Sequence, residues 1–261
     1  MNWKKTKTLL IFVFILVNIM LVFTYIDKVK KSNINDIGKE NAVNFHQEGI
    51  EIPDKLPSVK NVKMQLVTAR SFDFTNFAKS HSDVTRAKSG EAAKGNLSDA
   101  IDVGNDQYSD LKSYIQKNVY KGDDYELSKI DDNEVTFVQT YNNYPIMDND
   151  KARLKFKVDS DGKTSSYNQT AMKSIEPSNG ANNDKKQVNS AKKAIEQLYF
   201  NRYLKRNDEV TNARLGYYTV VEEPNVQVLQ ANWEIKVNHK GKITTYYVEA
   251  ASNNPKINKK D

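Results

Sequence analysis

Residues 152–167 read ARLKFKVDSDGKTSSY, and residues 231–246 read ANWEIKVNHKGKITTY. The two stretches align without gaps at an offset of 79, and they share a turn glycine, the lysine that follows it and a later tyrosine. In both, apolar and polar residues alternate before the glycine, as in a strand with one buried face that enters a hairpin turn. Alternation by itself is common, but the shared turn chemistry indicates a structural repeat.

A helical pattern precedes each of the two hairpins, at residues 106–119 and 190–205. Apolar residues recur there at helical spacing, so each helix presents one apolar stripe to a core. The stripes are formed by Leu111, Tyr114, Ile115 and Val119 in the first helix and by Ala191, Ala194, Ile195 and Leu198 in the second. We therefore predict an α+β fold in which two related units each pack one helix on three or four antiparallel strands.

The segment from residue 8 to residue 26 reads TLLIFVFILVNIMLVFTYI and contains no charged residue, proline or glycine. At about 1.5 Å per residue, a helix of this length spans the hydrocarbon core of a bilayer, which is about 30 Å thick. A cleaved signal peptide would have a shorter apolar region and small residues at the cleavage site, and residues 25–30 contain none. We therefore predict an uncleaved transmembrane helix, with residues 1–7 in the cytoplasm and the body outside the cell.

Asn18 lies near the middle of this predicted transmembrane helix. A carboxamide in hydrocarbon is costly unless it finds a hydrogen-bond partner, which can be another helix or the backbone of its own helix. The segment contains neither glycine nor alanine, so close packing of the GxxxG type is excluded. If a partner helix binds, we expect it to contact the face formed by Ile11, Phe14, Ile15, Asn18, Leu21, Val22 and Tyr25.

Prolines and polar runs divide the rest of the chain. Residues 79–106 contain no Phe, Tyr or Trp, and we expect a long surface excursion there. The run at 174–187, with Pro177, Gly180 and three Asn, is typical of a linker. The predicted order is a cytoplasmic tail at 1–7, a transmembrane helix at 8–26, a stalk at 27–57, a first extracytoplasmic unit at 58–178 and a second at 184–261.

Charge and composition exclude several classes of function. The net charge is +6, but +5 of it lies in residues 1–7 and 27–31, which flank the apolar segment. The body therefore lacks the basic stripe of a nucleic-acid-binding protein. Surface contacts with protein partners remain, and the strand residues Tyr167, Tyr246 and Tyr247 are candidates for them, although tyrosines on strands also serve as core residues.

The sequence contains no recognisable catalytic or metal-binding motif. There is no Cys, which excludes disulfides, thiolate catalysis and Cys-ligated zinc, and the three His are far apart. Asp159-Ser-Asp161-Gly162 begins like a calcium loop, but Thr164 and Thr170 stand where that loop requires Gly and Glu. We predict a protein that is not an enzyme and that uses no cofactor and no metal.

Four features together resemble the YycI (WalI) family. They are the N-terminus MNWKKTKT, the single apolar helix, the segment RSFDFTNF at 70–77 and the late run from WEIKV at 233–237 to YVEA at 247–250. The family regulates the YycG–YycF (WalK–WalR) two-component system of low-GC Gram-positive bacteria. The resemblance implies partners, namely a YycG/WalK-like sensor histidine kinase and a YycH-like regulator. It also implies control of cell-wall metabolism through contacts of the transmembrane helices and extracytoplasmic domains.

The hairpins are also similar to PepSY-type units, and this similarity leaves a protease-modulating role as one alternative. The other alternative is an anchored cell-wall-binding module or hydrolase, which would require an aromatic cleft or a pair of catalytic carboxylates. The resemblance to the YycI family assigns no catalytic residue to the chain.

Overall fold

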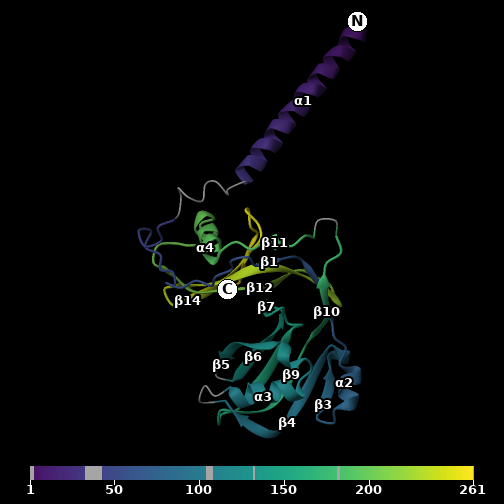
Figure 1. Ribbon diagram of the computed structural model, residues 1–261, viewed down its shortest axis with the longest axis vertical. Coiled ribbons are helices and arrows are strands. Elements are labelled where there is room, and N and C mark those ends of the chain that lie inside the picture. Colours follow the sequence, from purple (N-terminus) through teal and green to yellow (C-terminus); the bar gives the residue numbers. More distant parts are fainter. Residues whose placement is uncertain (1–2, 33–42, 104–107, 132, 181–182, 261) are drawn as a thin grey trace.

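The computed structural model describes residues 3–32, 43–103, 108–131, 133–180 and 183–260 (Figure 1). Helix α1 (Trp3–Ser32) stands at one end of the molecule, and the remaining elements form two β-sheets with a helix packed on each. The described side chains from Leu10 to Tyr25 are all exposed. Within the described residues, no helix meets the requirements of length and apolar content for a membrane span. The transmembrane assignment of residues 8–26 stays a prediction.

The first sheet is antiparallel throughout and carries helix α3 (Ser109–Asn118) on one face. Leu111 and Ile115 of this helix are buried in one cluster with Phe137 and Phe156, whose rings meet edge to face. In spatial order the strands are β5 (Tyr125–Asp131), β6 (Glu134–Tyr141), β8 (Arg153–Val158), β9 (Lys163–Gln169), β4 (Ala92–Asp102) and β3 (Val84–Ala87). The short helices are α2 (Thr75–Ser80), which packs near β3, η2 (Lys88–Gly90) and η3 (Gly122–Asp124).

The second sheet is built on the long hairpin β12 (Asp208–Glu222) and β13 (Val226–His239). Helix α4 (Ala191–Phe200) covers its face, where Ile195 and Leu198 are buried with Trp233. The Trp233 indole donates a hydrogen bond of 2.9 Å to the carbonyl of Asn189, just before this helix. The other strands are β2 (Val67–Ser71), β10 (Met172–Pro177), β14 (Lys242–Glu249), β15 (Ile257–Lys260) and β7 (Tyr144–Met147), with β1 (Lys63–Met64) and β11 (Lys186–Gln187) forming a separate small ladder.

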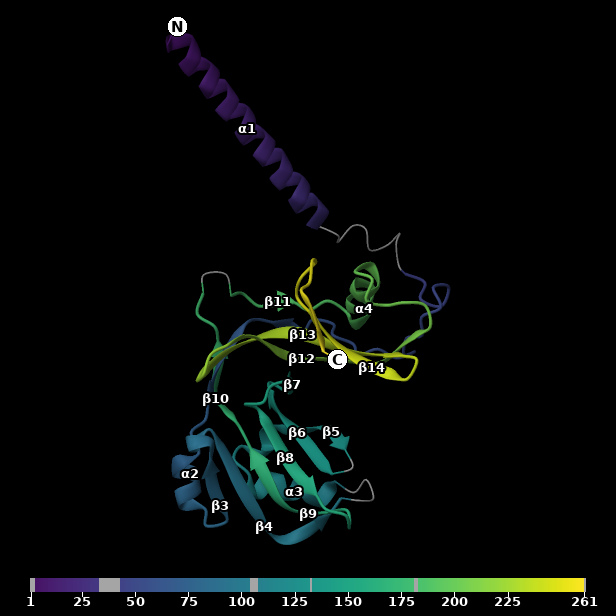
Figure 2. The ribbon, with the colours of Figure 1, turned by 180° about the vertical axis from the view of Figure 1, so that it is seen from behind.

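Two segments join the sheets, and Figures 1 and 2 both place them between the layers. Strand β7 forms a hairpin with β6 and then runs parallel to β12 through the pairs Tyr217–Ile146 and Tyr218–Met147. At the start of β10, the buried Gln139 side chain of β6 pairs with the backbone of Met172 through hydrogen bonds of 2.7 and 3.0 Å. The sheets are therefore linked by the parallel pair of β7 with β12 and by the Gln139 side chain. The prediction of antiparallel strands did not include a parallel pair.

The predicted hairpin repeat is present, down to its register. Phe156 faces Tyr167 across β8 and β9, and Ile235 faces Tyr246 across β13 and β14. These two pairs are equivalent at the offset of 79. The preceding helices place Ile115 and Ile195 in the two cores. A mixed α+β fold dominated by strands is therefore confirmed, because the alternation sets which face of each strand is buried.

The predicted boundaries between the stalk and the two units differ from the observed packing. Strands β2 and β10 lie in the predicted first unit, yet β2 pairs with β13 and β10 pairs with β2 on the edge of the second sheet. Phe45 and Ile50, from the predicted stalk, are buried in the core of the second sheet. Short apolar runs on either side of a unit can complete a neighbouring sheet, and local patterns do not reveal such pairing.

The predicted surface excursion at residues 79–106 was wrong in its central part. Residues 92–102 form β4, which pairs with both β3 and β9. The strand escaped prediction because small residues form most of its buried side: Ala93 and Gly95 face the core, and Leu97 is the one buried bulky side chain. A Cβ at Gly95 would lie 2.2 Å from the ring of Tyr167, so glycine is required for this ring to pack on the strand.

We expect Gly95→Ala to lower the free energy of unfolding by about 1–3 kcal/mol, because the added methyl group overpacks the Tyr167 ring. Gly180→Ala is the matched control, since a Cβ there meets nothing within 4 Å. Urea unfolding of the full chain in detergent, followed by tryptophan fluorescence, measures both variants. Equal stability of the two would show that the Tyr167 ring does not rest on β4.

Alkaline pH should destabilise the fold because several core tyrosines are held neutral. Burial raises the pKa of Tyr125, Tyr167 and Tyr247, and it raises the pKa of Tyr217 to about 12. In the unfolded chain these groups ionise near pH 10, so above that pH the folded state binds more protons. The contribution of these tyrosines to the free energy of unfolding should therefore be constant below about pH 9 and fall as pH rises from about 10 to 12.

Urea unfolding at stepped pH, with tyrosinate absorbance recorded in parallel, measures this effect. A Tyr217→Phe variant should lose less stability between pH 10 and 12 than the parent. Ionisation of all fourteen tyrosines near pH 10 in a chain that stays folded would contradict the burial of these side chains.

Candidate functional site

The seven residues predicted to contact a partner helix all lie on α1, and all are exposed in the structure. Asn18 donates a hydrogen bond of 2.8 Å from its side-chain amide to the carbonyl of Phe14, one turn earlier. This bond satisfies the amide within the helix, which is one of the two alternatives considered for Asn18. Among the described residues its side-chain oxygen has no hydrogen bond, so this acceptor remains for a lateral partner.

The three tyrosines proposed as surface contacts are core residues, and the prediction of exposed tyrosines was wrong. Tyr167, Tyr246 and Tyr247 are only 1%, 6% and 4% exposed. Tyr167 packs on Phe156 inside the first core, and Tyr246 packs on Tyr203 in the second. Tyr247 points to the opposite face, where its ring stacks on Tyr218 and its hydroxyl donates to Glu234 at 3.4 Å. Tyr167 and Tyr246 are buried in the cores beneath α3 and α4, and Tyr247 is covered on the other face by Tyr218.

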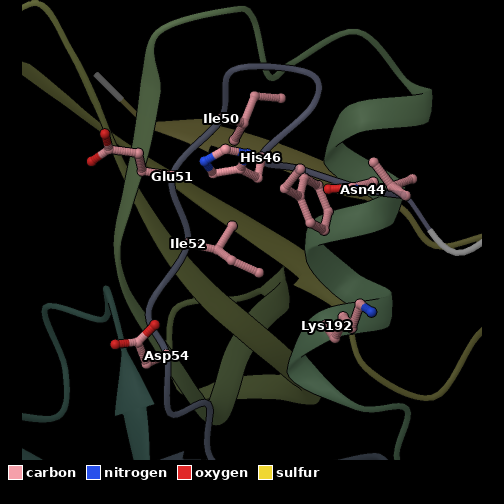
Figure 3. Close-up of a pocket in the computed structure, with 9 residues that line it drawn as sticks. Asn44, His46, Ile50, Glu51, Ile52, Asp54 and Lys192 are labelled. Atoms are coloured by element: carbon pink, nitrogen blue, oxygen red, sulfur yellow. The ribbon is translucent and has the colours of Figure 1, made fainter.

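The concave feature nearest in sequence to α1 is an open hollow of about 740 Å³, between residues 43–54 and helix α4 (Figure 3). Phe45 and Ile50 are buried at its base, and Ile52 is partly exposed within it. Figure 3 shows Lys192 on the helix and Asp54 on the facing segment, with Ile52 between them. We refer to this feature as the proximal hollow.

Backbone hydrogen bonds fix residues 45–51, which form one wall of the proximal hollow. The amide of Ile50 donates to the carbonyl of Phe45 at 2.9 Å, and Gly49 makes the turn at a φ of +68° that favours glycine. Glu51 then pairs with the start of β12: its amide donates to the carbonyl of Asp208, and its carbonyl accepts from Val210, at 2.9 and 2.8 Å. These bonds fix the backbone and leave the Glu51 side chain exposed.

Contacts with α4 hold the other side of the loop. The Phe45 ring meets the Tyr199 ring edge to face at 6.3 Å. A hydrogen bond to the Glu48 carboxylate raises the pKa of Tyr199. Burial raises the pKa of Glu196, although Lys192 and a hydrogen bond from the Val43 backbone act in the opposite direction. The loop therefore packs on α4 as a part of the folded body.

The proximal hollow has the chemistry of a contact surface. Its base is apolar, and its exposed side chains include Glu51, Asp54 and Lys192. Charged groups around an apolar patch suit a polypeptide partner, because the apolar area supplies affinity and the charges supply selectivity. Within the described residues, no cluster of three or more His, Cys, Asp or Glu could hold a metal ion.

Residues 29–251 match the profile of the YycI protein family, and this range includes the proximal hollow, the first sheet and every strand of the second sheet except β15. The chain belongs to the YycI family. Membership of the YycI family indicates a regulator associated with the YycG (WalK) two-component system, as the sequence resemblance implied. No known enzyme activity belongs to the YycI family.

Two solved structures have a distant likeness to this YycI-family chain. An uncharacterized protein from Eubacterium rectale aligns with a TM-score of 0.49 and 8% sequence identity, over 80% of this chain and 91% of that chain. The Bacillus megaterium YpeB C-terminal domain aligns with a TM-score of 0.36 and 14% identity, over 68% of this chain and 81% of that chain. None of the curated proteins matches the chain.

The proximal hollow was not predicted from the sequence, which assigned its residues to a stalk. A weak signal was present, because Ile50 and Ile52 alternate with Glu51 as in a strand with one buried face. This pattern is too short to predict a strand, and Pro53 interrupts it. Only contact with α4 and β12 shows that the segment is part of the core.

Ile50→Ala should lower the free energy of unfolding by about 2–5 kcal/mol, because the Ile50 side chain is 3% exposed and its loss leaves a cavity. Ile130→Ala, the same chemical change at a side chain that is 48% exposed, should have an effect below about 0.5 kcal/mol. Urea unfolding of both full-length variants in detergent makes the comparison. If Ile50→Ala were as neutral as Ile130→Ala, residues 43–52 would belong to a stalk after all.

Proposed function

We propose that the chain is a membrane-anchored regulator that binds a YycG/WalK-like sensor histidine kinase and a YycH-like regulator. In this proposal α1 crosses the cell membrane once, with the N-terminus in the cytoplasm and the sheets outside the cell. Binding modulates the two-component signalling that controls cell-wall metabolism. The observation that carries the proposal is the match of residues 29–251 to the YycI family.

The apolar surface of α1 supports the membrane anchor. Phe12 and Tyr25 are each 69% exposed and lie about 140° apart around the helix. Exposed apolar surface in water is unfavourable by about 25 cal/mol per Å², so a helix that is apolar all round is stable only when lipid or protein covers it. The lysines at both ends of the apolar stretch would lie at the membrane interfaces.

A regulator of this kind needs only to bind one state of the kinase more tightly than the other. Coupling free energies between sites are typically about 1–3 kcal/mol, and one hydrogen bond with a few side-chain contacts is sufficient for this difference. The Asn18 oxygen and its neighbours supply such a contact inside the membrane. Outside the membrane, the proximal hollow follows α1 in the sequence after residues 33–42, and this short separation supports a contact there with a second membrane-tethered protein.

The burial of the three candidate tyrosines weakens the alternative that the protein binds the cell wall. This alternative requires an exposed aromatic surface for sugar rings, and the three tyrosines that could have supplied one are buried. The PepSY-like alternative rests on hairpin similarity alone. We therefore retain kinase regulation as the proposed function.

Site-specific crosslinking in living cells tests the partner contact. A photoreactive residue at position 18 should capture the sensor kinase or the YycH-like protein, identified by mass spectrometry. Position 16 is the matched control, because it lies about 200° away around the helix at a similar membrane depth. Equal capture of these partners from both positions, or capture of neither partner from position 18, would contradict a specific contact through the Asn18 face.

A helix exchange separates anchoring from recognition. Replacement of residues 8–26 by an unrelated transmembrane helix should keep the protein in the membrane fraction and abolish the regulation that depends on helix contact. Unchanged kinase output after the exchange would remove the intramembrane part of the proposal. Recovery of the mature parent protein from the medium without its first thirty residues would rule out the anchor.

A further inference from the structure

A charged groove lies between the two sheets, on the faces opposite to α3 and α4. Its walls come from β5, β6 and β8 on one side and from β12, β13, β14 and β15 on the other, and its volume is about 520 Å³. This volume is in the range of small-molecule sites, about 300–1,000 Å³, and is too small for a folded partner domain. We refer to this feature as the inter-sheet groove.

The origin of the inter-sheet groove is the alternation of the strands. In β13, Trp233, Ile235 and Val237 point into the core beneath α4, so Glu234 and Lys236 point the other way. In β8, Leu154 and Phe156 point toward α3, and Lys155 lines the groove. Two polar sheet faces therefore face each other, and neither unit alone encloses the space.

Among the described residues, the lining of the inter-sheet groove contains six Lys or Arg and four Asp or Glu. Each of the four carboxylates already has a basic partner within the lining. The paired carboxylates are Asp131 with Lys129 at 2.8 Å, Glu134 with Lys155 at 2.9 Å, Glu234 with Arg214 at 3.2 Å, and Asp148 with Arg153 at 3.1 Å and with Lys260. Arg153 also pairs with Asp150 at 2.6 Å and Arg214 with Glu126 at 3.5 Å, so Lys236 is the one basic side chain of the lining without an ion pair among the described residues.

Two hydrogen-bond donors of the second sheet remain without a partner. Lys236 makes no ion pair among the described residues. The Nε atom of Arg214 is buried and has no hydrogen-bond acceptor in the described part of the chain. A buried donor without an acceptor is unfavourable by about 1–3 kcal/mol, and an anionic ligand near it would remove this penalty.

The register places further donors in a row across the second sheet. Lys236 pairs with Thr245 of β14, and Thr245 pairs with Lys260 of β15. Adjacent strands are about 4.8 Å apart, so the two lysines lie about 10 Å apart on one face with the threonine hydroxyl between them. Lys155 faces this row from the first sheet. A single small anion would satisfy one end of the row, whereas an extended anion would contact both lysines.

We propose that the inter-sheet groove binds an extended anion that carries several phosphate groups, either as free polyphosphate or as part of a phosphodiester polymer. Lys236, Thr245 and Lys260 contact successive phosphate groups from the second sheet. Lysine suits this ligand because its compact charge attracts phosphate oxygens without a demand for planar geometry. This inference concerns a ligand site and does not depend on the kinase contact of α1.

Titration calorimetry of the full chain in non-ionic detergent, with short-chain inorganic polyphosphate as the probe, tests the proposal. We expect saturable binding that weakens as salt is raised, because charge attraction is screened. Lys236→Gln should weaken binding by about tenfold. Lys112→Gln is the matched control, because Lys112 is exposed on α3 and its replacement changes the net charge equally. Its affinity should stay within about twofold of the parent.

Titrations with other probes distinguish free polyphosphate from a phosphodiester polymer, and both of these from an acidic peptide. Orthophosphate should bind weakly, and a purified phosphodiester polymer identifies the second source if it binds more tightly than polyphosphate. Absence of polyphosphate binding at millimolar concentration would overturn the proposal, as would equal losses in Lys236→Gln and Lys112→Gln. Tighter binding of poly-glutamate than of polyphosphate would also overturn it and would assign the groove to an acidic peptide. Among the described residues Lys236 has no ion pair to lose, and an unchanged thermal midpoint of Lys236→Gln verifies that the variant is folded.

Discussion

The architecture depends on the two-sided alternation of one strand, β13. Along one edge β13 pairs with β12, and along its other edge it pairs first with β2 and then with β14. Its odd-numbered residues from Ala231 to Val237 are buried beneath α4, and Glu234 and Lys236 face the other sheet. A shift of one residue would move Trp233 and Ile235 into the charged inter-sheet groove, so the burial of these side chains determines the register of the whole second sheet.

The two sheets are not independent units joined by a simple linker, because strands from distant parts of the sequence pair in each of them. The chain enters the second sheet through β2, builds the first sheet, and returns through β10 to pair with β2. Strand β7 adds a parallel contact with β12 in the middle of this path. Gly216 of β12 permits this contact, because a Cβ there would lie 2.5 Å from the carbonyl of Pro145. Each sheet is therefore completed by segments that are distant in sequence.

Three surfaces of the protein have different chemistry and suit different ligands. The α1 helix offers an apolar surface with one amide, the proximal hollow offers an apolar base with charged side chains, and the inter-sheet groove offers a polar lining in which Lys236 has no ion pair among the described residues. The exposed apolar surface of α1 fits the membrane anchor that we propose. A polar groove made by both sheets fits a small charged ligand whose binding would stabilise their observed arrangement.

The sequence by itself determined the local features of this protein. The alternation in 152–167 and 231–246 set the strand faces and the hairpin register, helical stripes identified α3 and α4, and the apolar run at 8–26 identified α1 as an exceptional helix. Only the tertiary structure decided which strands pair at a distance, because β2, β4 and β10 carry short or small-residue patterns that fit several partners. It also decided that Tyr167, Tyr246 and Tyr247 are buried, that residues 43–52 are core, and that two polar sheet faces enclose a groove. Burial depends on what covers a face, and a periodic pattern in one strand does not contain that information.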